Sequence, residues 1–118
     1  MSLFVDSNDG YQSGTAGDNA VQVTVRATNF YGLDVVNTTA SVLYVMVFDS
    51  ATTVVDGYAP LIQVAVPANS SGKIVKQLPL TKWNIKNGLF ICSSSTPKVK
   101  TLAAAGSMML YCYYTYNS

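Results

Sequence analysis

Apolar and polar residues alternate with a period of two along much of the chain, which is the pattern of β-strands with one buried face. In AVQVTVRAT, residues 20–28, the apolar positions fall at every second residue and are separated by Gln22, Thr24 and Arg26. Similar short runs follow at 61–67, 74–80, 82–85, 89–94, 98–102 and 108–116. The pattern predicts about seven or eight short strands.

One run differs from the others because it is apolar on both faces. In SVLYVMVFD, residues 41–49, one face carries Val42, Tyr44, Met46 and Phe48, and the other carries Leu43, Val45 and Val47. A strand that is apolar on both sides is typical of a sheet interior that is covered on both faces. We expect 41–49 to be a central strand.

Turn-forming residues separate these runs. NFYGLDVVNTT, residues 29–39, predicts a loop around Gly32. Asn87-Gly88 is a strong hairpin signal, which would make 82–85 and 89–94 neighbouring strands.

The fold class follows from these elements. No segment shows a long apolar period of 3.6 residues with helix caps, so the sequence predicts an all-β fold. Short strands separated by turns favour a two-layer antiparallel β-sandwich, immunoglobulin-like or jelly-roll, over a small barrel. A chain of 118 residues has the size of one ordinary domain, which we assign to residues 20–118.

Residues 1–19 are expected to form an extended N-terminal arm. The segment DSNDGYQSGTAGDN consists almost entirely of loop-forming residues and has no periodic apolar face. Such an arm becomes ordered when another surface supplies contacts for it. Leu3, Phe4 and Val5 are candidate anchors on a neighbouring molecule, and Tyr11 is a further candidate interface residue.

Few residues are charged: seven are basic and six are acidic, which gives a formal net charge of +1. Because the charges form no basic run, we expect no nucleic-acid partner. A surface of uncharged polar residues is weakly protected against self-association, which hints at a homo-oligomer. No segment reaches the roughly 20 apolar residues of a membrane helix, and the N-terminus lacks the pattern of a secretory signal. We expect no membrane partner, and synthesis and folding in a cytosol.

The two cysteines, Cys92 and Cys112, lie inside apolar runs. A buried free cysteine behaves as a small hydrophobic residue, and in a cytosol both would start as thiols. The alternative is a disulfide that joins neighbouring strands.

The residue types that most enzymes and metal sites need are missing. The chain has no histidine, which removes the usual general base, a common metal ligand and the standard catalytic triads. Two cysteines without histidine cannot close a zinc site within one chain, and no phosphate-binding glycine loop occurs. No segment matches a calcium loop, which leaves a weak structural ion as the remaining metal hypothesis. We expect no enzymatic activity and no cofactor, and we assign no catalytic or metal-binding residue.

FDSATTVVDGYAP, residues 48–60, is the loop in which an acidic pair is most plausible. Asp49 and Asp56 would be the two carboxylates of such a pair, but aspartate is also the ordinary residue for closing a turn through backbone N–H groups. We interpret Asp49 as the end of a buried strand and Asp56-Gly57 as a turn. If this loop has a function, it is to present surface to a neighbouring protein.

The last run, MMLYCYYTY, carries four tyrosines. In a strand Tyr111 and Tyr113 share one face, and Tyr114 and Tyr116 share the other. One pair is expected to face the core, and the other to be available to solvent, a sugar or a partner. We take Tyr114 and Tyr116 as candidate interface residues; the alternative is that the tyrosines serve β-propensity alone.

Five motifs follow one another between residues 44 and 116: YVMVFDSAT, a GYAP loop, VAVPANSSG, NGLFICSSST and the tyrosine-rich final strand. This order resembles small structural proteins of tailed-phage virions. The matching segments are 48–52, 57–60, 66–68, 88–96 and 110–116, and the likeness extends over about three fifths of the chain. The resemblance implies a non-enzymatic β-sandwich that sits on, or cements, a phage particle.

We therefore expect a virion structural protein, most specifically a capsid decoration or cement protein that is made in the host bacterial cytoplasm. Its partners would be the major capsid protein or another virion protein, and further copies of itself, as in a trimer. By binding only the assembled shell, it would stabilise the phage head. The alternative is a carbohydrate-binding or host-adhesion module of a tail or head fibre, with Trp83 or the tyrosines stacking on sugars.

Overall fold

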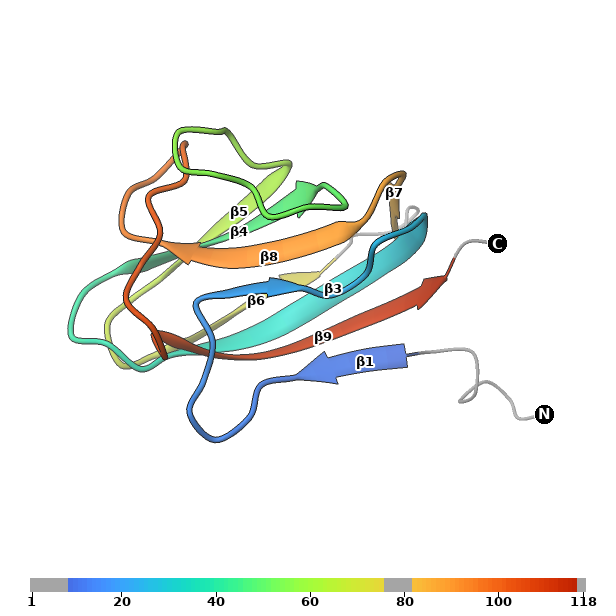
Figure 1. Cartoon of the computed structure of the whole chain (residues 1–118). Helices are drawn as coiled ribbons and strands as arrows, with labels where there is room; N and C mark the ends of the chain where they lie inside the picture. Colours follow the sequence, from blue (N-terminus) through green and yellow to red (C-terminus); the bar gives the residue numbers. More distant parts are fainter. Residues whose placement is uncertain (1–8, 76–81, 117–118) are drawn as a thin grey trace.

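Two antiparallel sheets pack face to face in the computed structural model, which describes residues 9–75 and 82–116 (Figure 1). The first sheet contains β1 (Asp9–Gln12), β9 (Met108–Tyr116), β3 (Thr28–Asn37) and β6 (Ser71–Val75) in that order, and β7 (Trp83–Ile85) also pairs with β3. The second sheet contains β2 (Ala20–Gln22), β8 (Leu89–Ser94), β4 (Leu43–Asp49) and β5 (Ile62–Val66). The described residues contain no helix, so the predicted all-β sandwich is confirmed.

The strand pairs are nested along the chain. β1 pairs with β9, β2 with β8, β3 with β6 and β4 with β5, and successive pairs alternate between the two sheets. Eight strands paired in this way across two sheets form a jelly roll, to which β7 is an addition. Of the two sandwich types expected, the topology is that of the jelly roll.

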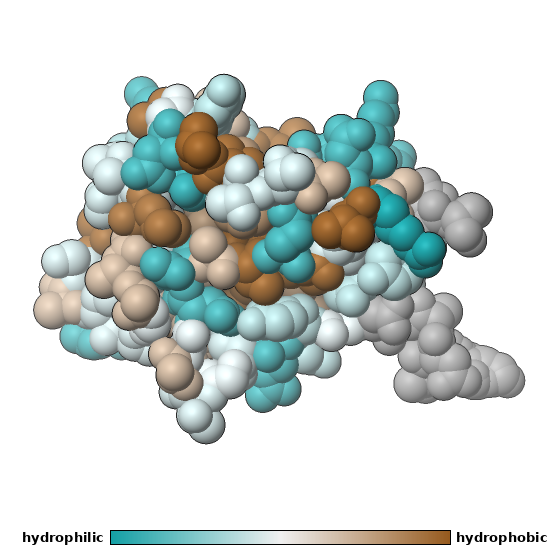
Figure 2. All heavy atoms as spheres, in the orientation of Figure 1, coloured by the Kyte–Doolittle hydropathy of each residue, from teal (hydrophilic) through white to brown (hydrophobic). Residues whose placement is uncertain are grey.

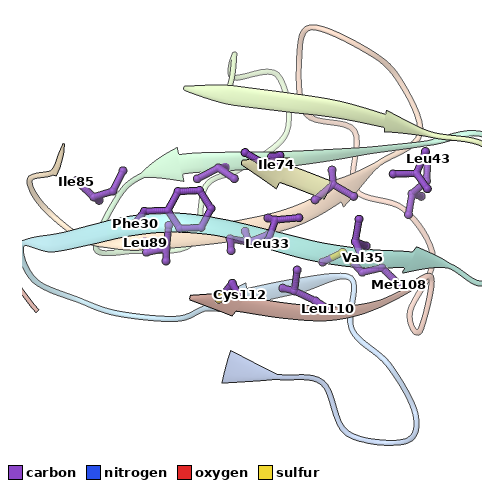
Figure 3. Packing of buried hydrophobic residues seen from close by; sticks show 14 residues of the cluster. Phe30, Leu33, Val35, Leu43, Ile74, Ile85, Leu89, Met108, Leu110 and Cys112 are labelled. Carbon is purple, nitrogen blue, oxygen red and sulfur yellow. The ribbon is translucent and has the colours of Figure 1, made fainter. Parts of the chain in front are cut away.

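The main core lies between the sheets, where every second side chain of the facing strands points inward (Figure 3). Leu33 and Val35 of β3 and Leu110 of β9 meet Val45 of β4 and Leu89 of β8, and none of these five is more than 2% exposed. Burial of this apolar surface is the main stabilising contribution to the fold.

The central strand expected over 41–49 is confirmed as β4. It lies between β8 and β5, and it is buried on both faces. Its inward residues Val45 and Val47 join the main core, whereas Met46 and Phe48 point away from it into a second apolar cluster.

The loop predicted around Gly32 is wrong, because 28–37 form β3, the longest strand. Gly32 marks a β-bulge, at which the register with β9 shifts after Phe30. Its φ of 148° favours glycine, so the residue that suggested a loop instead bends a continuous strand.

The single strand predicted over 20–28 is also wrong. β2 ends at Gln22, and the chain then crosses to the other sheet before β3 begins at Thr28. Thr24 stabilises this corner, because its Oγ1 lies 2.6 Å from Oγ1 of Thr28 and accepts the backbone N–H of Leu89 at 3.0 Å. The corner leaves Val25 exposed to solvent.

Asn87-Gly88 does not form the predicted hairpin. β7 belongs to the first sheet and β8 to the second, so the residues between them turn a corner of the sandwich. A Cβ on Gly88 would lie 2.8 Å from the carbonyl oxygens of both Ser50 and Thr24, which explains the need for glycine here. The strand predicted over 98–102 is likewise a loop, held to β8 by the isolated bridge between Ser94 and Leu102.

The described part of the predicted arm, residues 9–19, lies along the edge of the domain. β1 pairs with β9, and Asp18 forms a bridge to Met108. The carboxylate of Asp18 accepts hydrogen bonds from the Tyr11 hydroxyl at 2.6 Å and the Ser13 hydroxyl at 2.7 Å. Tyr11 and Ser13 therefore bind the end of this segment to its beginning.

Both cysteines are free and buried, as expected. Cys112 belongs to the main core, and Cys92 belongs to the second cluster. Burial raises the pKa of each thiol to about 12, so neither has the thiolate character that a nucleophile or metal ligand needs.

Candidate interaction surfaces

The outer face of the second sheet is covered by two loops. Met46, Phe48, Phe90 and Cys92 form a cluster on this face, and none is more than 5% exposed. Val54, in the loop that follows β4, packs against them. We call residues 50–61 and 95–107 the covering loops; the first contributes Val54 to this second, smaller core, and the second is hydrogen-bonded to the first.

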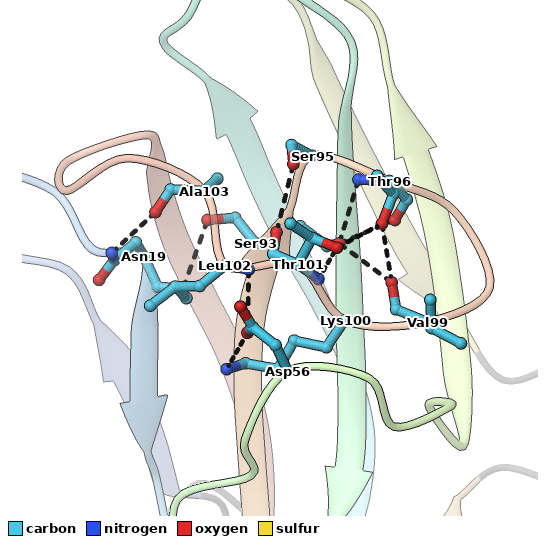
Figure 4. A network of polar contacts seen from close by, with 11 residues as sticks. Asn19, Asp56, Ser93, Ser95, Thr96, Val99, Lys100, Thr101, Leu102 and Ala103 are labelled. Carbon is cyan, nitrogen blue, oxygen red and sulfur yellow. Dashed lines mark hydrogen bonds and ion pairs between the residues drawn. The ribbon is translucent and has the colours of Figure 1, made fainter.

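The two covering loops are joined by backbone and charged contacts, of which Figure 4 shows those of Asp56 with Lys100 and Leu102. Gly57 N–H donates to the Lys100 carbonyl, and Lys100 N–H donates to the Tyr58 carbonyl, both at 2.8 Å. The Lys100 ammonium lies 3.1 Å from Oδ1 of Asp56, and the same oxygen accepts Leu102 N–H at 3.1 Å. The Lys100 hydrogen bond, followed by that from Leu102, lowers the pKa of Asp56.

Apolar side chains project outward from these joined loops. Val55, Tyr58 and Leu61 are 62%, 60% and 53% exposed, and Val99 and Leu102 are also exposed. We call these five residues the loop surface. Tyr58 and Leu61 line an open depression of about 530 Å³ with Val54 and Val55. Figure 2 shows brown apolar residues among teal polar ones at the top, where the 50–61 loop lies.

Both acids of FDSATTVVDGYAP hold loops in place. β4 ends at Asp49, whose carboxylate accepts the backbone N–H groups of Lys86 at 3.0 Å and Asn87 at 2.8 Å. Asp56 joins the two covering loops, and it forms a turn with Gly57, whose φ is 99°. The interpretation of Asp49 as a strand end and of Asp56-Gly57 as a turn is confirmed.

The outer face of the first sheet is open, in contrast to the second. Leu33, Val35, Leu110 and Cys112 point into the core, so the residues between them on β3 and β9 point outward. We call this outward set, with its β1 and β6 neighbours, the tyrosine face; it consists of Gln12, Asp34, Val36, Lys73, Met109, Tyr111 and Tyr113.

Two exposed tyrosines dominate this face. The rings of Tyr111 and Tyr113 pack edge to face, with centroids 4.8 Å apart. The Tyr113 hydroxyl donates to Oδ2 of Asp34 at 2.8 Å, and this bond raises the pKa of Tyr113. The Tyr111 ring lies over Gly10 on β1: a Cβ added to Gly10 would be 3.4 Å from both Cε1 and the hydroxyl oxygen of this ring.

The candidate residues Tyr114 and Tyr116 lie on the other face of β9. Tyr114 packs against the main core. Tyr116 is exposed at the end of the strand, where the guanidinium carbon of Arg26 lies 3.8 Å from its ring centroid. The predicted sharing of faces is confirmed by the edge-to-face contact of the pair, whose centroids are 5.6 Å apart. The assignment of this pair to an interface stays a prediction.

The remaining candidates divide into two groups. Leu3, Phe4 and Val5 lie outside the described residues, so their proposed role as anchors stays a prediction. Tyr11 is half-buried against the main core, and the hydrogen bond to Asp18, with burial, raises its pKa to about 12. Trp83 is half-buried and packs against Phe30 at a centroid distance of 5.5 Å, so it is not an open stacking platform.

Residues 9–75 and 82–116 contain no group of three or more histidine, cysteine, aspartate or glutamate side chains that could hold a metal ion. They also include no helix of the length and apolarity needed to cross a membrane.

Sequence reasoning missed the individual residues of the loop surface. The available signal was the occurrence of Val55, Tyr58 and Leu61 within a segment otherwise composed of turn formers. Alternation patterns do not register such residues, because a loop has no fixed period. Exposed apolar residues gathered in one loop region are a recognised mark of protein contact.

Comparisons with known proteins give a likeness of shape only. No family model matches the chain, and no curated protein does. Among solved structures, the Tobacco streak virus coat protein is similar with a TM-score of 0.44 and 10% identity, over 97% of this chain and 88% of that chain. The coat protein dimer of the same virus gives a TM-score of 0.44 and 9% identity, over 96% and 88%. A likeness of this degree carries no argument about what the chain does.

Proposed function

We propose that the protein is a structural, non-enzymatic component of a virus particle, and most specifically a decoration or cement protein of a tailed-phage head. The loop surface is its contact with the major capsid protein or another virion protein. The observation that carries the proposal is the exposure of Val55, Tyr58 and Leu61 on a loop that the Asp56–Lys100 contact holds in place.

A contact of this kind stabilises a shell by mass action. A protein that binds the assembled shell, and not the separate subunits, adds its binding free energy to the stability of the shell. Many copies on one lattice then add through avidity. Because the loops are already fixed by backbone hydrogen bonds, little conformational entropy is lost when their apolar side chains become buried.

The motif order from YVMVFDSAT to the final tyrosine-rich strand supports the tailed-phage assignment. The jelly-roll topology is compatible with it, since viral capsid proteins are among the users of this fold. The same fold also occurs in lectins, so the surfaces, and not the fold, decide the function.

The test compares occupancy on purified particles of the virus that encodes the chain. The double variant Tyr58→Ser/Leu61→Ser removes two apolar contacts from the loop surface, and Val36→Ser makes a similar change on the opposite sheet. We expect at least a tenfold loss of affinity for the double variant, roughly what one or two hot-spot residues supply, and no loss for Val36→Ser. Copies per particle are measured by gel densitometry, with thermal midpoints as a check of folding. Wild-type occupancy of the double variant would overturn the proposal.

Two parts of the proposal need separate measurements. Deletion of residues 1–8 removes Leu3, Phe4 and Val5 without touching β1, and reduced occupancy is expected if these residues anchor the protein. Light scattering of the free protein tests the proposed trimer, and a monomer at micromolar concentration contradicts self-association before assembly.

A further inference from the structure

A groove crosses the tyrosine face beside the exposed tyrosine pair. Its volume is about 620 Å³, within the range of roughly 300–1,000 Å³ that small-ligand sites occupy. The walls include Gln12 from β1, Tyr111 and Met109 from β9, and Lys73 from β6, while Asp34 of β3 lies among them. Four strands thus contribute side chains to one concave site on an ordered sheet.

The charged and amide side chains of this groove, Asp34, Lys73 and Gln12, form no hydrogen bond or ion pair with one another. Asp34 and Lys73 stand directly opposite each other on β3 and β6, yet they form no ion pair. Oδ2 of Asp34 accepts the Tyr113 hydroxyl, while Oδ1 accepts no hydrogen bond from any described residue. The Gln12 amide and the Lys73 ammonium also have no partner in the described part of the chain. Solvent or a ligand must satisfy these groups.

The charges of the groove limit the kind of ligand. One carboxylate and one ammonium leave no net local charge, so the site has no strong preference for an anion or a cation. The groove offers a carboxylate acceptor, an ammonium donor and an amide that does both. A ligand with several uncharged hydroxyl groups, each able to donate and to accept, complements this set.

The aromatic pair supplies the apolar part of the site. The edge-to-face contact with Tyr113 holds Tyr111 at the side of the groove, and Gly10, which has no side chain, leaves room for the ring to lie over β1. The ring is 42% exposed, so one surface is available for packing. A pyranose ring has an apolar C–H face that can lie on such a ring while its hydroxyls reach the polar groups beside it.

We propose that the tyrosine face is a binding site for a neutral saccharide, with Tyr111 as the stacking platform and Asp34, Gln12 and Lys73 as hydrogen-bonding groups. Tyr113 is a positioning residue, because its hydroxyl orients the Asp34 carboxylate and its ring supports Tyr111. This site lies on the opposite sheet from the loop surface, so its function is independent of the proposed contact with a virion protein.

The test uses saturation-transfer NMR on the full chain. The probes are the methyl glycosides of glucose, galactose, mannose and N-acetylglucosamine, together with an array of neutral glycans. We expect transfer to at least one probe, with the strongest signals from protons on one face of the sugar ring. Tyr111→Ala should weaken binding at least tenfold, roughly the loss for removing a stacking residue. Asp34→Asn keeps the shape of the side chain but replaces one carboxylate oxygen with an NH₂ group. This variant should weaken saccharide binding less than Tyr111→Ala does.

Matched controls separate this site from the loop surface. Tyr58→Ser removes an exposed tyrosine from the opposite sheet and should leave saccharide binding unchanged. Chemical-shift changes on titration should centre on Tyr111, Asp34 and Lys73. Absence of binding to every probe, or binding that survives Tyr111→Ala, overturns the proposal. Attachment of a virion protein to the tyrosine face, without any saccharide binding, also overturns it.

Discussion

The two outer faces of the sandwich differ in how they meet solvent. On the second sheet, Met46, Phe48 and Phe90 are covered by loops, and the apolar residues that reach solvent lie on the loops themselves. On the first sheet no loop within residues 9–75 and 82–116 covers the strands at Asp34, Tyr111 and Tyr113, and both tyrosines are exposed. One sheet therefore supports a preformed loop surface, and the other provides a shallow polar groove with an aromatic wall.

The two sheets of one jelly roll thus present two surfaces of different chemistry. The covered face gains stability from a second apolar cluster, whereas the open face lacks that burial and leaves its hydrogen-bonding groups accessible. Changes on the covered face should consequently affect stability, and changes on the open face should affect binding.

The largest effect is expected from Phe90→Ala beneath the covering loops. The ring is 1% exposed and lies 6.1 Å from that of Phe48, so its removal leaves a cavity. The free energy of unfolding should fall by about 3–5 kcal/mol. Tyr111→Ala on the open face should cost about 1 kcal/mol or less. Urea unfolding followed by fluorescence measures both, and equal losses would contradict the difference between the faces.

The next largest effect is expected from Gly88→Ala, compared with Gly10→Ala on β1 of the first sheet. Gly88→Ala would bring a Cβ to 2.8 Å from two backbone carbonyl oxygens, which cannot move away easily. We expect a loss of about 1–3 kcal/mol in unfolding free energy, as for overpacked sites. Gly10→Ala meets its closest atom at 3.3 Å and the flexible Tyr111 ring at 3.4 Å, so its thermal midpoint should change less. The reverse order of midpoints would be incompatible with this packing.

A smaller, pH-dependent effect is expected from Asp56→Asn. Because folding lowers the pKa of Asp56, the unfolded chain binds this proton more readily. The contribution of this carboxylate is complete above the unfolded pKa of about 4, and it is lost as pH falls through the lower folded-state pKa. The stability of the wild type should therefore fall more steeply below pH 4, relative to pH 7, than that of Asp56→Asn. Parallel stability curves for the two proteins would show that the contact with Lys100 contributes nothing.

The smallest effect is expected from Tyr113→Phe on the open face. The variant loses a hydrogen bond between two groups near solvent, so unfolding free energy should change by about 0.5 kcal/mol or less. Saccharide affinity should nevertheless fall, because the Asp34 carboxylate is no longer oriented. Calorimetry and NMR titration measure the two quantities, and a change in stability without a change in affinity would contradict the positioning role.

Local patterns in the sequence predicted those elements whose structure depends on nearby residues. The two apolar faces of 41–49 indicated a covered central strand, and β4 is such a strand. Alternation along the final run also placed Tyr111 with Tyr113, and Tyr114 with Tyr116, on shared faces.

Other features depended on contacts between distant residues. Asn87-Gly88 has the composition of a hairpin turn, but the following strand, β8, belongs to the other sheet and pairs there with β4 and β2. Gly32 favours a loop on local grounds, whereas pairing on both sides of β3 makes it a bulge. Which tyrosine pair faces outward was likewise undetermined, since it depends on the burial of Leu110 and Cys112 in the main core.

The most direct measurement is a cryo-electron microscopy map of the virus particle with the protein bound. We predict that the loop surface, with Val55, Tyr58 and Leu61, contacts the underlying shell, and that the tyrosine face points to solvent. A map in which the tyrosine face lies against the shell, or in which the loop surface touches nothing, would contradict the account.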